Sequence, residues 1–112
     1  MPQIQDVTDA GVRTLLEQAR EEMRAGDATG SVHTSVDALK RLWELRPEEL
    51  AALTDPALTR EMPDTVHFPD YGVKLERNDG IAVVRYRRER FSVSEAIAHY
   101  EFALGRAVAL GV

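Results

Sequence analysis

The chain has 112 residues and a mass of 12.5 kDa, which is the size of one domain and excludes two independent lobes. It contains no cysteine, which excludes a disulfide framework, a thiolate nucleophile and cysteine-based metal sites. Hydrophobic residues make up 44% and charged residues 29%, as in a globular protein, and the net charge of −5 argues against nucleic acid as a partner.

The apolar runs are short. The longest have four residues, as in Ile81–Val84, far below the roughly 20 needed to cross a bilayer, so no membrane segment is expected. The first six residues lack the basic and apolar stretches of a secretory signal. We therefore expect a cytoplasmic protein.

The first part of the chain has helical periodicity. From Val12 onward apolar residues recur every three or four positions, which predicts a helix over about 8–25 with Thr8 or Asp9 as its N-cap. Two glycines and small polar residues in segment 26–31 predict a loop that reverses the chain. This pattern is typical of an antiparallel helical hairpin.

The second helix of the hairpin carries apolar residues from Val32 onward. Thr34 and Asp37 have the spacing of a capping box, which predicts the helix start, and Pro47 ends the helix. Because proline is tolerated in a first helical turn and acidic residues follow it, a short helix over about 47–53 is predicted.

Prolines shape the middle of the chain. A further helical turn from Pro56 to Met62 is predicted, with Asp55 as its cap. The segment from Pro63 to Asp70 is expected to be extended and to include a short edge strand.

The clearest non-helical pattern is two alternating segments around Asn78-Asp79-Gly80, which predict a β-hairpin. A two-residue Asp79-Gly80 turn puts Leu75 opposite Val84 and leaves one face apolar. Moving the turn to Asn78-Asp79 slides the pairing by two residues and keeps the same faces; we prefer Asp79-Gly80. The apolar face then consists of Tyr71, Val73, Leu75, Ala82, Val84 and Tyr86.

A long helix is predicted at the C-terminal end. Ser92 and Glu95 form a capping box, and Phe91 can pack against the first turn. The main apolar face of this helix is expected to comprise Val93, Ile97, Tyr100, Leu104 and Val108, widened by Ala96, Ala103, Ala107 and Leu110.

Together these elements predict one α+β domain over residues 1–112. It consists of a helical hairpin, short helices, a β-hairpin and a long C-terminal helix. An isolated hairpin is marginal in water, so its outer edge must be covered by a helix, joined by Thr65–Phe68 as a third strand, or paired with another subunit. The last option predicts a homodimer.

Charge is unevenly distributed. Residues 71–90 hold six basic and three acidic side chains, whereas the rest of the chain carries a net charge of −8. Lys74, Arg85 and Arg87 are expected to project from the hairpin face opposite the apolar one. They either pair with acidic groups of this chain or bind an acidic protein or a second copy, and nucleic acid is the least favoured partner.

Two further groups of residues are candidates for a site. Glu95, His99, Phe102 and Arg106 form a second stripe on the last helix, which is either half-buried or a contact surface. Asp64, His67 and Asp70 could hold a metal, but the spacing is not a metal-binding signature. We expect no metal site and no cofactor.

The function predicted from these patterns is a small protein-interaction or regulatory module, such as an adaptor, regulatory subunit or inhibitor, that self-associates. The alternative is a small metal-independent enzyme or ligand-binding domain that uses His67, His99, Tyr100 and arginines of the hairpin. The candidate interface residues are Lys74, Arg85, Arg87, His99, Phe102 and Arg106.

Overall fold

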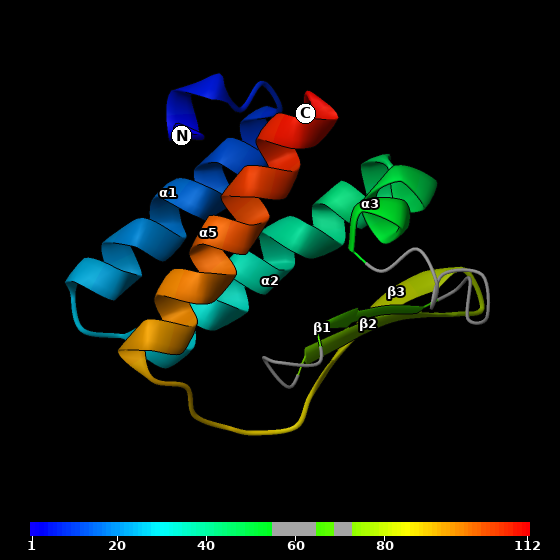
Figure 1. The fold of residues 1–112 in the computed structure, drawn as a ribbon. Helices are drawn as coiled ribbons and strands as arrows, with labels where there is room; N and C mark the ends of the chain where they lie inside the picture. The colour runs from blue at the N-terminus through cyan, green and yellow to red at the C-terminus, as the bar shows by residue number, and fades with distance from the viewer. Residues whose placement is uncertain (55–64, 69–72) are drawn as a thin grey trace.

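The computed structural model describes residues 1–54, 65–68 and 73–112 (Figure 1). Its elements, in chain order, are η1 (Ile4–Asp6), α1 (Ala10–Arg24), α2 (Ala28–Leu45), α3 (Pro47–Thr54), β1 (Thr65–Phe68), β2 (Val73–Asn78), β3 (Ile81–Tyr86) and α5 (Val93–Leu110). The predicted α+β class is confirmed. The predicted helical turn at 56–62 and the side chains of Asp64, Asp70 and Tyr71 lie outside the described residues.

The helical hairpin of α1 and α2 is confirmed, but the predicted start of its second helix is wrong. The helix begins at Ala28, where the Asp27 side chain accepts a hydrogen bond from the Gly30 N–H. Gly26, with a φ of 85°, turns the chain within a shorter connection than predicted. Thr34 does not cap the helix because its hydroxyl bonds to Glu22 on α1.

The two helices approach closely through small residues. Ala19 and Ser31 are both fully buried, and the Ser31 hydroxyl donates to the Ala19 carbonyl at 2.7 Å. A polar residue at this position is stable because its hydroxyl has a partner on the facing helix. The short helix predicted after Pro47 is confirmed as α3.

The described strands form an antiparallel sheet in the order β1-β2-β3. The preferred register of the hairpin is confirmed, with Leu75 opposite Val84. Asp79 and Gly80 both have positive φ, 52° and 80°, as a type I′ turn requires. The predicted strand at Thr65–Phe68 pairs with β2, so β3 is an edge of this sheet.

The last helix, α5, begins with the predicted capping box of Ser92 and Glu95. Its buried face differs from the predicted one, since Val93 is 58% exposed and Ile97 42% exposed. Figure 1 shows α5 lying against α1 and α2. The small side chains of Ala96, Ala103 and Ala107 face this contact, and Val93 and Ile97 are left on the exposed side. The buried residues are Ala96, His99, Ala103, Leu104 and Ala107.

The central element of the fold is α2, which packs against α1, α5, α3 and β3. Figure 1 shows α5 lying across α1 and α2, with the sheet to one side of this helical layer. Both termini lie at the same end of the helices, where the Thr8 N–H donates to the Val112 carbonyl at 3.0 Å. Among the described residues, no helix is long and apolar enough to cross a membrane.

Candidate functional site

The outer face of the hairpin carries the predicted basic residues. Lys74 lies opposite Arg85, a like-charge pair that alone would repel. Glu76 removes this repulsion, because its carboxylate pairs with Lys74 at 3.4 Å and with the Arg85 guanidinium. The hydrogen bond from Arg85 is the main reason why the pKa of Glu76 is lowered. Two of the three predicted cations are thus paired within the chain.

The other side chains on this face are more exposed to solvent. Ile81 is 67% exposed, and Arg87 is also exposed. Within residues 1–54, 65–68 and 73–112, Arg87 forms no ion pair. An apolar side chain at the start of β3 and a cation just after its end therefore remain accessible.

The backbone of β3 completes this surface. In a hairpin closed by a two-residue turn, the flanking residues Asn78 and Ile81 form a hydrogen-bonded pair, and such pairs then alternate along the ladder. The N–H and C=O groups of Ala82, Val84 and Tyr86 consequently point away from β2. No described strand pairs with this side of β3, so it presents an open edge.

The stripe predicted on the last helix does not form one exposed surface. His99 is only 1% exposed, so its assignment to an outer contact surface is wrong. Phe102 is half-buried, with the Arg106 guanidinium 4.1 Å from its ring centroid. Arg106 also donates to the Leu53 carbonyl at the end of α3. This flank of α5 therefore packs partly within the molecule.

Two histidines meet at an aromatic cluster that the sequence did not reveal. The Phe91 ring lies 5.7 Å from the buried His99 ring and 6.3 Å from the exposed His33 ring. The ring centroids of Tyr86, on β3, and His33 lie 4.5 Å apart. Burial lowers the pKa of His99 and raises the pKa of the Tyr86 hydroxyl. The cluster joins the sheet to α2 and α5.

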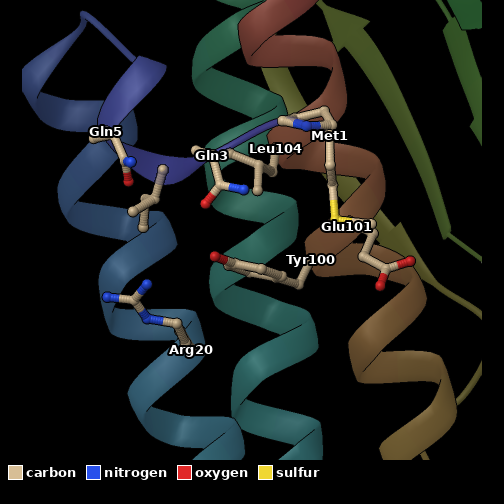
Figure 2. A pocket seen from close by; sticks show the side chains of 9 residues that line it. Met1, Gln3, Gln5, Arg20, Tyr100, Glu101 and Leu104 are labelled. Atoms are coloured by element: carbon tan, nitrogen blue, oxygen red, sulfur yellow. The ribbon is translucent and has the colours of Figure 1, made fainter.

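The enzyme alternative gains little from this cluster. His99 is enclosed, and its Nδ1 is bonded to the Glu95 carbonyl at 2.7 Å, so it cannot reach a substrate in this conformation. Tyr100 lies apart from it, beside the N-terminal segment (Figure 2). The His67 side chain lies outside the described part of the chain.

No group of three or more metal-binding side chains occurs among the described residues. Comparison of the chain with protein-family models, with curated proteins and with solved structures finds no match. The site is therefore interpreted from its own chemistry.

Proposed function

We propose that this protein is a small interaction module of the cytoplasm that self-associates through the open edge of β3. The observation that carries the proposal is an edge strand whose outward backbone groups, at Ala82, Val84 and Tyr86, have no partner strand among the described residues. Such an edge is a template for a further strand. The absence of cysteine suits a reducing compartment.

The partner that fits this edge best is a second copy of the chain. Antiparallel pairing of β3 with β3 of the partner subunit would join two three-stranded sheets about a two-fold axis. The outward backbone groups then form hydrogen-bonded pairs between Ala82 of one subunit and Val84 of the other. This arrangement requires no change in the hairpin, because those groups do not bond to β2.

Charge disfavours one of the possible registers. With Val83 opposite its own copy, Ile81 lies opposite the arginine at 85, whose aliphatic stem can cover it. Asp79, in the turn before β3, and the arginine at 87, just after β3, then lie at the same end of the paired strands, which brings together two pairs of opposite charge per dimer. Centring the axis two residues further along would instead place Arg85 against its own copy, which is unfavourable.

Native mass spectrometry of the purified chain tests the assembly. We expect a dimer of the 12.5 kDa chain at micromolar concentration. Val84→Pro should give a monomer, because proline removes an outward N–H and leaves the bonds between β2 and β3 in place. A wild-type chain that stays monomeric at high micromolar concentration would contradict the proposal.

A charge variant tests the register and does not depend on a proline in the sheet. Arg87→Glu should weaken the dimer by about tenfold or more, because it opposes Asp79 of the partner subunit. Arg90→Glu makes the same charge change three residues further along the chain and is the matched control, which should leave the dimer unchanged. Equal weakening by both variants would show that net charge, and not this pairing, governs assembly.

A further inference from the structure

A cavity of about 380 Å³ lies between the N-terminal segment, α1 and α5. Figure 2 shows Arg20 rising from α1, the ring of Tyr100 extending from α5 toward α1, and Gln3 above them. Ile4 and Leu104 contribute apolar walls. This volume falls in the range typical of pockets for small molecules, which are mostly apolar with a few polar groups.

The wall formed by the N-terminal segment is held in place. The Gln3 N–H donates to the Asp6 carboxylate, the Asp6 N–H donates to the Gln3 carbonyl, and Ile4 packs against the core. Val7 is fully buried, and its carbonyl accepts hydrogen bonds from Arg13 on α1. The part of this wall from Gln3 to Val7 is thus fixed to the rest of the molecule.

Two polar side chains that line the cavity, those of Arg20 and Tyr100, have no partner among the described residues. The Arg20 Nε is shielded from bulk water and has no hydrogen-bond partner, and the residue forms no ion pair within the described chain. The Nε itself is too enclosed to reach a ligand, but a guanidinium at a cavity wall with no acidic partner can bind an anion through its terminal N–H groups. The Tyr100 hydroxyl also forms no hydrogen bond to any residue that the structure describes.

The remaining lining residues narrow the class of ligand. Glu101 lies at the cavity and would repel a dianion such as phosphate. Ile4 and Leu104 favour an apolar body. A single negative charge at one end of an apolar molecule satisfies both conditions.

We infer that the cavity binds a small organic monocarboxylate. Arg20 and Tyr100 hold its carboxylate, and its apolar body lies between Ile4 and Leu104. The site is independent of the β3 edge, which lies on other elements.

Titration of the full-length ¹⁵N-labelled protein with benzoate and octanoate tests the inference. We expect saturable shifts of amide resonances confined to the N-terminal segment, α1 and α5. Benzamide, the neutral analogue, should bind at least about tenfold more weakly than benzoate, because it lacks the charge that Arg20 recognises. Inorganic phosphate should not compete.

Arg20→Gln should weaken benzoate binding by about tenfold or more, and Tyr100→Phe should weaken it several-fold. Arg24→Gln is the matched control, because Arg24 lies on the same helix, is exposed and pairs with Glu21; its affinity should equal that of the wild type. The inference is overturned if neither carboxylate binds at millimolar concentration. Equal binding by the folded Arg20→Gln variant, or equal binding of benzamide, would also overturn it.

Discussion

Single side chains define where the long helices of this protein begin. Asp9, Asp27 and Ser92 each accept a hydrogen bond from a backbone N–H in the first turn that follows. These bonds satisfy donors that a helix leaves unpaired at its start. Asp9 has a second partner, because Arg41 of α2 donates to its carboxylate at 2.8 Å, so one residue caps α1 and ties it to α2.

Asp9→Ala should lower the free energy of unfolding by about 1–2 kcal/mol. The hydrogen bond from Arg41 is the main cause that lowers the pKa of Asp9. The stabilisation should therefore be complete above the unfolded pKa of 3.8 and be lost as the pH falls through the lower folded value. Chemical denaturation at several pH values measures both effects. Glu17→Ala, an exposed change in the same helix, is the control.

His99 is the residue whose burial has the clearest consequence for pH. Because burial lowers the pKa of His99 below the ordinary 6.5, the unfolded chain binds a proton more readily than the folded one. Stability should therefore fall as the pH drops through 6.5. Between about pH 7.5 and pH 5 the melting temperature should fall less for His99→Gln than for the wild type. Identical slopes for His99→Gln and the wild type would argue against this role.

At the scale of elements, α5 contains a glycine with no structural requirement. Gly105 lies in the helix interior, and a Cβ built on it would meet no atom within 4 Å. Glycine in a helix costs roughly 0.5–1 kcal/mol relative to alanine. We expect Gly105→Ala to raise the free energy of unfolding by about that amount, measured by chemical denaturation.

Gly11→Ala provides the matched comparison for this prediction. Gly11 is also helical, but a Cβ there would lie 2.6 Å from the Arg41 Nε. The added methyl group would displace Arg41 from Asp9, so this variant should gain no stability. Stabilisation of both variants by the same amount would show that helix propensity alone decides, and that the contact with Arg41 is unimportant.

The whole molecule depends on α2, because this helix contacts the other long helices and the sheet. Leu39 is fully buried on α2, and Trp43, the only tryptophan, has the Arg77 guanidinium of β2 at 4.5 Å from its ring centroid. Fluorescence of Trp43 therefore reports how the sheet docks on the helix. Far-UV circular dichroism reports the helices themselves.

Leu39→Ala should destabilise the protein by about 2–5 kcal/mol, the usual cost of a cavity in a core. Because one core joins helices and sheet, the fluorescence and dichroism transitions should coincide and move together. Ile81→Ala, an exposed aliphatic change, is the control and should have little effect on the monomer. Separate transitions in Leu39→Ala would mean that the sheet unfolds independently.

Local chemistry allowed much of the fold to be predicted. The Ser92 and Glu95 capping box, the helix after Pro47 and the Asp79-Gly80 turn depend on neighbouring residues, and each is present as expected. The hairpin register followed because a type I′ turn and alternating apolar residues agree on one pairing. A cap or a turn depends on residues only a few positions apart, so the local sequence is enough to predict it.

Features that depend on distant neighbours were decided by the tertiary structure. Asp27, and not Thr34, begins α2 because Thr34 bonds to Glu22 across the helical hairpin. Likewise α5 presents alanines and His99 to the core because α1 and α2 approach closely.

The cavity that contains Arg20 and Tyr100 joins the N-terminal segment and α1 to α5, which is far from both in the sequence. The sequence by itself determined the capping box of α5, the turn and the class of the fold. Which flank of a broad apolar face is buried, and which polar groups meet, depended on packing, because periodicity defines a face but does not identify the neighbour that covers it.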